Sequence, residues 1–337
     1  MTNVVVTGAN GFIGKALCQT LTCAGYTVTG VVRAADRIDA SAPYHFAVIG
    51  EIDGTTNWFE CIAQVDVIVH LAAQVQVAQR NASQCLATMR MVNFEGTENL
   101  ARQAAAAGVK RLVYVSTVKI NGEQTYGRPF KPEDAPSPRD PYAISKFEAE
   151  QALLRVASET ALQPIIIRPP LVYGPGVKGN FLSLIRWIDK GLPLPLAHID
   201  NRRSLIALDN LIDILMRCIH HPAVSGEIFL VSDGEDLSTP ELIRRIAGAL
   251  RRPARLWPVP MTLLRLAAQA IGKRQGFDRL CDSLQVDSSR ARTVLGWRPP
   301  VPVNQALSCT IEWYQRRKCD ERSVIITKCE SHDRGHV

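Results

Sequence analysis

Tyr142 and Lys146 lie four residues apart in the segment YAISK, directly after Asp140-Pro141, a pair typical of a helix start. On a helix this spacing places a phenol and an ammonium on one face. A nearby positive charge favours the phenolate and lowers the tyrosine pKa from its usual value of about 10. Lowering this pKa to about 7 requires roughly 4 kcal/mol of differential stabilisation. Such a tyrosine can exchange a proton with an alcohol or ketone oxygen while hydride moves on the other side.

Thr117 is a third candidate for the same chemistry. It directly follows a predicted strand, Arg111–Ser116, and the carboxyl ends of strands in α/β sheets are where ligands bind. Its hydroxyl can hydrogen-bond the oxygen that exchanges a proton with Tyr142. The Tyr-Lys spacing alone is common, and Tyr142 alone is compatible with an ordinary surface position. The three residues together predict an oxidoreductase-type site.

The segment TGANGFIG (7–14) carries glycines at intervals of three, between a predicted strand and a predicted helix. Glycine permits a tight turn and lets a pyrophosphate approach the helix N-terminus, where free N–H groups favour negative charge. In this position the pattern predicts a dinucleotide-binding βαβ unit.

The first half of the chain alternates short β-branched runs with helical stretches. Continuous apolar strands between helices predict a parallel sheet covered on both faces, that is, a doubly wound α/β fold of the Rossmann type. The predicted strands are Val4–Thr7, Tyr26–Val32, Val65–His70, Arg111–Ser116 and Pro164–Arg168, and the helices are Phe12–Ala24, Thr88–Ala107 and Pro141–Ala157.

We expect a nucleotide-binding domain at residues 1–168, with 204–231 returning to the sheet. Residues 169–203 and 232–317 then form a smaller C-terminal α/β lobe that binds substrate, ending in a helix near Asn304–Arg317. Within the lobe, Leu256–Ile271 has an apolar face, for which packing is favoured over contact with a membrane. The polar tail 318–337 is expected to be disordered. Its cysteines and histidines have no compact zinc spacing, and no metal site is predicted.

The composition describes an ordinary globular protein: 337 residues, 46% hydrophobic and 21% charged. The sequence has no apolar run of membrane-spanning length and no N-terminal signal pattern, and its nine cysteines form no CxxC pair. We therefore expect a cytoplasmic protein with reduced thiols and no stable membrane insertion.

Positive charge is concentrated in one part of the second half of the chain. Between Arg244 and Arg298 there are twelve Lys and Arg residues and three Asp residues. This surplus is either a solvated face or an attraction for a nucleotide phosphate; nucleic acid is not expected.

Six motifs carry a family resemblance: TGANGFIG (7–14), HLAA (70–73), NFEGT (93–97), YVST (114–117), YAISK (142–146) and RPPLVYGPG (168–176). The chain resembles the extended short-chain dehydrogenases/reductases of the NAD-dependent epimerase/dehydratase family. The resemblance implies a catalytic triad of Thr117, Tyr142 and Lys146, and a homodimer formed through Thr88–Ala107 and Pro141–Ala157. It implies a cofactor site made of Gly8, Asn10, Gly11, Phe12, Ile13, Gly14, Arg33, Glu51, Ile52, Leu71, Ala72, Ala73, Asn93, Tyr142, Lys146 and Pro169.

The end of the second predicted strand bears on the choice of cofactor. NAD-selective relatives place an acid where this chain has Val32, and Arg33 follows, with Arg37 nearby. An arginine attracts the 2′-phosphate that an acid would repel. NADP(H) is therefore favoured, although NAD(H) remains possible and Arg33 is also compatible with a plain surface position.

The second half of the chain resembles nucleotide-sugar enzymes. Asn180, Arg202 and Arg203 match positions that contact the nucleotide and its diphosphate, and a guanidinium suits phosphate oxygens. Thr117, Asn121 and Arg279 complete the predicted UDP-sugar site. Leu171 replaces an asparagine found in many epimerases, and Val118-Lys119 replaces the Asp-Glu pair of 4,6-dehydratases, so dehydration is not expected.

These features favour NADPH-dependent reduction of the C4 ketone of a UDP-linked 6-deoxy-N-acetylhexosamine, as in surface polysaccharide precursor synthesis. Such reductases form UDP-N-acetylquinovosamine or UDP-N-acetylfucosamine. The alternative is an NAD-dependent UDP-glucose or UDP-N-acetylglucosamine 4-epimerase that uses the same triad. A catalytically silent nucleotide-sensing protein is a third interpretation, against which the intact triad argues.

Overall fold

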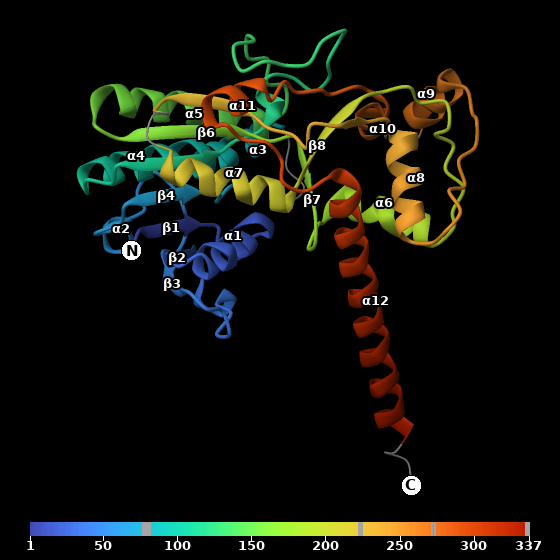
Figure 1. Cartoon of the computed structure of the whole chain (residues 1–337), viewed down its shortest axis with the longest axis horizontal. Coiled ribbons are helices and arrows are strands. Elements are labelled where there is room, and N and C mark those ends of the chain that lie inside the picture. Colours follow the sequence, from blue (N-terminus) through green and yellow to red (C-terminus); the bar gives the residue numbers. More distant parts are fainter. Residues whose placement is uncertain (76–81, 222–224, 271, 273, 334–337) are drawn as a thin grey trace.

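Seven parallel strands form the central sheet of the computed structural model, which describes residues 1–75, 82–221, 225–270, 272 and 274–333 (Figure 1). The strand order is β3-β2-β1-β4-β5-β6-β9. This is the doubly wound Rossmann arrangement predicted from the sequence. The strands are β1 Asn3–Thr7, β2 Thr27–Val32, β3 His45–Val48, β4 Val67–His70, β5 Arg111–Val115, β6 Gln163–Arg168 and β9 Glu227–Leu230.

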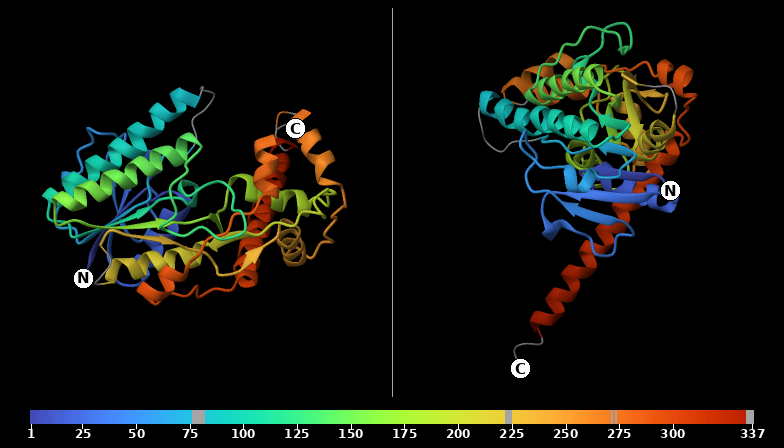
Figure 2. Two further views of the ribbon diagram at one scale, coloured as in Figure 1. Left: turned by 90° about the horizontal axis from the view of Figure 1, so that it is seen from above. Right: turned by 90° about the vertical axis from the view of Figure 1, so that its left-hand side faces the viewer.

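Helices cover both faces of this sheet because successive side chains of a buried strand point to opposite sides. Val4 and Val6 of β1 pack into one core and Val5 into the other. Figure 2 shows the two helical layers with the sheet between them. The first layer contains α1 Phe12–Cys23, α7 Leu208–His220 and α11 Ser289–Leu295, and the second contains α2 Phe59–Ile62, α4 Gly96–Ala106 and α5 Pro141–Glu159.

The smaller lobe surrounds a three-stranded sheet of order β10-β8-β7 and has its own apolar core. Ser238 caps helix α8 by accepting a hydrogen bond from the Glu241 N–H at 3.2 Å. The strands are β7 Leu171–Tyr173, β8 Arg203–Ala207 and β10 Asp236–Leu237, and the helices are α6 Gly179–Asp189, α8 Thr239–Ala249, α9 Met261–Ala270, α10 Arg274–Cys281 and α12 Val303–Asp333.

The chain returns to the large sheet later than predicted. Strand β8 pairs with β7 and β10 in the small sheet, so the return begins with α7 rather than at residue 204. Strand β9 then pairs with β6, as the sequence predicted.

The helix predicted at Thr88–Ala107 is interrupted. Helix α3 spans Ala82–Met89, a π-helical segment follows at Arg90–Glu95, and α4 then begins at Gly96. π-helical turns are frequent at functional sites, and this one carries the candidate cofactor residue Asn93.

The expectation of disorder from residue 318 was wrong for most of the tail. Helix α12 continues to Asp333 and extends away from the rest of the molecule (Figure 1). Residues 334–337 lie outside the described range. The described residues hold no cluster of possible metal ligands, and none of their helices has the length and apolarity needed to cross a membrane.

A buried ion pair connects β6 to α5. The Arg168 guanidinium donates to both carboxylate oxygens of Glu150, at 3.0 and 2.5 Å, and both side chains are almost completely buried. The remaining guanidinium nitrogen of Arg168 donates to Asn121 Oδ1 at 3.0 Å. The interaction therefore joins the last residue of β6, the middle of α5 and the segment that follows Thr117.

Glu150→Gln should destabilise the fold by about 3–5 kcal/mol, because it leaves the Arg168 charge buried without a counter-charge. Chemical denaturation monitored by circular dichroism measures this change. Glu98→Gln is the matched control, because Glu98 pairs with Arg102 on the surface and should contribute less than about 1 kcal/mol. Equal effects of the two substitutions would contradict the role given to the buried pair.

Candidate active site

The glycine-rich turn between β1 and α1 has no room for side chains. Gly8 has a φ of +69°, and a Cβ added there would lie 3.0 Å from the Ala72 nitrogen. A Cβ at Gly14 would lie 2.1 Å from the Gly8 carbonyl oxygen. Gly11 is the N-cap of α1 and supplies no side-chain cap. The first N–H groups of α1 therefore keep their capacity to bind a pyrophosphate, so the turn fits the dinucleotide predicted from the sequence.

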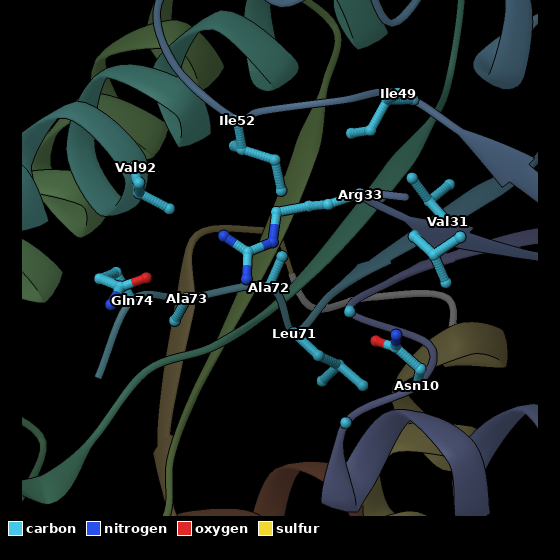
Figure 3. A pocket seen from close by; sticks show the side chains of 13 residues that line it. Asn10, Val31, Arg33, Ile49, Ile52, Leu71, Ala72, Ala73, Gln74 and Val92 are labelled. Atoms are coloured by element: carbon cyan, nitrogen blue, oxygen red, sulfur yellow. The ribbon is translucent and has the colours of Figure 1, made fainter. Parts of the chain in front are cut away.

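A cavity of about 180 Å³ lies beside this turn. Eight of the predicted cofactor residues line it: Gly8, Asn10, Gly11, Arg33, Ile52, Leu71, Ala72 and Ala73. Sequence reasoning missed four other lining residues, namely Val31, Ile49, Gln74 and Val92, and it discussed the fifth, Val32, only as bearing on cofactor choice. Figure 3 shows apolar side chains from separate segments around this cavity. Only the folding of the chain brings them together, and apolar walls suit a flat aromatic base.

Arg33 extends from the end of β2 over the cavity (Figure 3). Its guanidinium lies 3.6 Å from the Glu51 carboxylate, and both side chains are substantially exposed. Arg33 in the cavity wall therefore has an acid beside it, just outside the cavity, where the ribose of an adenine nucleotide is expected. The side chain of Arg37 lies outside the described residues.

Eight of the predicted cofactor residues do not line this cavity. Asn93 is buried and braces its surroundings: its amide donates to Ser145 Oγ at 2.9 Å and accepts from the Gln74 N–H at 2.7 Å. It thereby connects a residue that lines the cavity to α5. The other predicted cofactor residues that do not line this cavity are Phe12, Ile13, Gly14, Glu51, Tyr142, Lys146 and Pro169.

Lys146 is buried under the end of β5. Its ammonium donates to the Val115 carbonyl at 2.7 Å and lies 3.9 Å from the centre of the Tyr114 ring. Burial lowers the pKa of Lys146 to about 7, against an opposing effect of the Glu150 carboxylate one turn further along α5. The lysine is thus poised to gain or lose its proton near neutral pH.

Tyr142 lies in the first turn of α5, which Asp140 caps by accepting the Ala143 N–H at 2.7 Å. Burial, and secondly the Asp140 charge, raise the pKa of Tyr142 above its usual value. Lys146 alone therefore does not lower the pKa of Tyr142; the expected lowering also requires a cationic nicotinamide beside the phenol. The ammonium of Lys146 is directed at the Val115 carbonyl, so burial and the nearby acid dominate at the phenol.

A second cavity, of about 380 Å³, opens between the sheet edge and the smaller lobe. Three of the predicted substrate residues line it, namely Thr117, Asn180 and Arg203. The remaining lining residues are mainly apolar: Val118, Lys119, Glu123, Pro170, Leu171, Phe181, Leu184, Ser204, Leu205, Leu237, Ser238, Thr239, Leu242, Leu280 and Leu284.

Arg203 is held in place within this cavity. Its guanidinium donates to the Asp282 carbonyl at 2.8 Å, and burial lowers its pKa, with the Asp282 carboxylate opposing that effect. A guanidinium that is already partly desolvated and oriented suits the diphosphate of a nucleotide.

The other predicted substrate residues do not join Arg203 in the cavity lining. Asn121 is buried, with its amide bonded to Arg168 and to the Lys131 carbonyl, so it is a structural residue. Arg202 is exposed outside the cavity. Arg279 belongs to α10, but its side chain lies outside the described residues.

Residues 4–232 match the Epimerase family, described as the NAD dependent epimerase/dehydratase family. The chain belongs to this family. A UDP-glucose 4-epimerase from Vibrio cholerae is 41% identical over 92% of this chain and 94% of its own length. A GDP-6-deoxy-D-mannose reductase from Pseudomonas aeruginosa is 26% identical over 94% and 98% of the two chains.

A solved structure has the same fold as this member of the epimerase/dehydratase family. It is a UDP-glucose 4-epimerase from Thermotoga maritima with UDP-glucose, which has a TM-score of 0.76 and 22% identity. The match covers 94% of this chain and 99% of the other. The family fold thus extends through the smaller lobe as well as the sheet.

Lys119 follows Thr117 by two residues and gives the site a feature of its own. Its ammonium lies 2.5 Å from the Asp140 carboxylate, so it partly neutralises the acid that faces Tyr142. Sequence reasoning singled out Lys119 as unusual but did not assign it to the site. Its partner is 21 residues away along the chain and is identified only by the fold.

Asp140→Asn should shift the acidic limb of the pH profile of kcat/KM to lower pH. The raised pKa of Tyr142 falls when the neighbouring negative charge is removed, so the phenolate forms at lower pH. Asparagine preserves the helix cap, which isolates the charge effect from stability. Asp134→Asn, at an acid paired with Arg128 on the surface, should leave the profile unchanged. A profile of Asp140→Asn that stays in place or moves to higher pH would contradict this coupling.

Proposed function

We propose that the protein is a 4-epimerase of a UDP-hexose, of the UDP-glucose or UDP-N-acetylglucosamine class, that uses a bound nicotinamide dinucleotide. The observation that carries this proposal is the position of β5 and α5 between two cavities. Thr117 lines the larger cavity, and Lys146 bonds to Val115 on the same strand. Asn93 connects Ser145, beside Lys146, to Gln74 in the wall of the smaller cavity. This arrangement supports a site in which the reacting groups would lie between a bound nucleotide and a sugar.

The larger cavity can accommodate a UDP-sugar in one orientation. Arg203 and Asn180 line the part formed by the lobe, where they would bind the diphosphate and the nucleoside. Phe181 and Leu242 offer apolar surface to the uracil ring. The hexose would then reach Thr117 at the end of β5.

In the proposed reaction Tyr142 accepts the proton of the C4 hydroxyl as the C4–H bond breaks, which gives a 4-keto sugar. A bound nicotinamide dinucleotide would supply the acceptor for this hydride and the donor for its return. Tyr142 then gives the proton back to the same oxygen, and the C4–H bond re-forms on the opposite face of the ring. Thr117 hydrogen-bonds the oxygen, and Lys146 holds the nicotinamide ribose and supplies a positive charge beside the phenol.

An epimerase must let the keto sugar turn between the two half-reactions. The cavity walls near Thr117 include Val118, Pro170 and Leu171, which form no side-chain hydrogen bonds. Hydroxyl groups of a rotating sugar would meet few fixed partners on this apolar side, although Lys119 and Glu123 also line the cavity. The similarity to the Vibrio cholerae UDP-glucose 4-epimerase supports the same proposal.

NADPH-dependent 4-keto reduction of a UDP-linked 6-deoxy-N-acetylhexosamine is the second candidate. Arg33 favours it, because a guanidinium over the cavity can bind a 2′-phosphate. The acid Glu51 at 3.6 Å works against it, because a carboxylate repels that phosphate.

Tyr142→Phe should lower the rate of interconversion of UDP-glucose and UDP-galactose by about 10²-fold or more, because the proton carrier is lost. Chromatography of the sugar nucleotides measures the rate, and a fluorescence titration should show cofactor affinity changed by less than about threefold. Tyr126→Phe, at an exposed tyrosine, is the control. The epimerase proposal would be contradicted if the wild-type protein interconverted neither UDP-glucose and UDP-galactose nor their N-acetylated counterparts. Consumption of NADPH with the UDP-4-keto sugar would then favour the reductase.

Comparison of cofactor dissociation constants tests the proposed function independently. An epimerase should bind NADH at least as tightly as NADPH, and Arg33→Ser should change the NADH constant by less than about threefold, since Arg33 already pairs with Glu51. The exposed Arg102→Ser is the matched control. An NADPH preference of tenfold or more, about 1.4 kcal/mol, that Arg33→Ser abolishes would favour the reductase instead.

A further inference from the structure

Large apolar side chains are exposed together on the smaller lobe. Trp187, Leu192, Trp257, Leu263 and Leu266 are each between 45% and 64% exposed. They come from two short segments, 186–192 and 251–266, which we call the lobe-tip patch. The preference for packing of Leu256–Ile271 was therefore wrong for part of this stretch. Met261 contacts the lobe core, whereas Leu263 and Leu266 of α9 face solvent.

The two segments of the patch are joined by hydrogen bonds. The Arg255 guanidinium donates to the Gly191 carbonyl at 3.2 Å. Just after the first segment, the Leu194 N–H donates to the Arg255 carbonyl at 2.8 Å, and the Leu194 carbonyl accepts from the Trp257 N–H at 2.9 Å. Leu194 and Leu256 form a β-bridge between them. Figure 1 shows α9 and the loop that leads to it on the side of the lobe farthest from the seven-stranded sheet.

The lobe-tip patch also carries a strong excess of positive charge. Its two segments contain six exposed basic residues: Arg186, Lys190, Arg251, Arg252, Arg255 and Arg265. Their one acid is Asp189, whose carboxylate is largely buried and accepts hydrogen bonds from Tyr314 and Lys318. The patch therefore combines exposed tryptophan and leucine with six cations, of which Arg252 lies 3.9 Å from the Asp189 carboxylate.

We propose that the lobe-tip patch binds the surface of an anionic lipid bilayer. Exposed tryptophan and leucine interspersed with arginine and lysine is the composition typical of segments that lie in the interface of a membrane. Basic residues are attracted to anionic lipids, and their long side chains keep the charge in the headgroup region while their stems cover apolar surface. Helix α9 has ten residues, so it can lie on a bilayer but cannot span one.

Charge complementarity separates this partner from a second copy of the chain. In a symmetric dimer the same patch faces itself, which would bring six cations on one protomer against six on the other. An anionic bilayer offers the opposite sign and an apolar layer beneath it. The bilayer therefore satisfies both properties of the patch.

Vesicle flotation with the purified full-length chain tests this proposal. The protein should float with vesicles of 7:3 phosphatidylcholine and phosphatidylglycerol in 0.1 M NaCl, and much less with phosphatidylcholine alone or in 0.5 M NaCl. Substituting serine for Trp257, Leu263 and Leu266 together should reduce the bound fraction at least tenfold. Phe59→Ser combined with Tyr126→Ser removes side chains that are 58% and 78% exposed elsewhere, and should not change binding.

A second variant tests the charge of the patch separately. Substituting glutamine for Arg251, Arg252 and Arg255 together should weaken binding to anionic vesicles several-fold. If circular dichroism shows that the triple serine variant does not fold, the triple glutamine variant and the single variant Trp257→Ser test membrane binding in its place. Wild-type protein that fails to float, or variants that float equally well, would overturn the proposal. A dimer in light scattering that the serine variant converts to monomer would assign the patch to self-association instead.

Discussion

The geometry of the active site depends on the buried ion pair between Arg168 and Glu150. Burying two charges is costly, and a buried pair adds little net stability compared with apolar residues. The pair instead fixes geometry, because each side chain holds the other in one position. The pair fixes α5 against the end of β6, and the bond to Asn121 fixes the segment after Thr117 to the same point. Helix α5 is thereby held in register with the sheet edge.

The same helix distributes charge along one face. Tyr142, Lys146 and Glu150 are spaced four residues apart, so the phenol, the ammonium and the carboxylate follow one another along the helix. Burial lowers the pKa of Lys146 to about 7 and raises that of Tyr142, so the phenol is not activated for proton transfer by the protein alone. A cationic nicotinamide ring beside these groups would favour the phenolate. Activation of Tyr142 would then be coupled to cofactor binding.

Epimerase and reductase differ less in their reacting groups than in what surrounds them. Both use one proton carrier and one hydride carrier, so the choice depends on how firmly the sugar is oriented and on which cofactor is retained. The apolar wall at Leu171 and the acid Glu51 beside Arg33 both favour reversible chemistry on a bound dinucleotide. These two positions, rather than the triad, would carry the specificity of the protein.

The family resemblance implied eight residues that line the smaller cavity. The sequence patterns themselves predicted the Rossmann sheet and the glycine-rich turn, and they singled out Thr117, Tyr142 and Lys146. These signals are local: strand periodicity, glycine spacing and a four-residue helical interval all lie within short segments. The pKa direction at Tyr142, the structural role of Asn121, the lining of the larger cavity and the exposure of Leu263 and Leu266 were decided by tertiary structure. Each of these depends on burial or on charges contributed by distant segments, which no local pattern records.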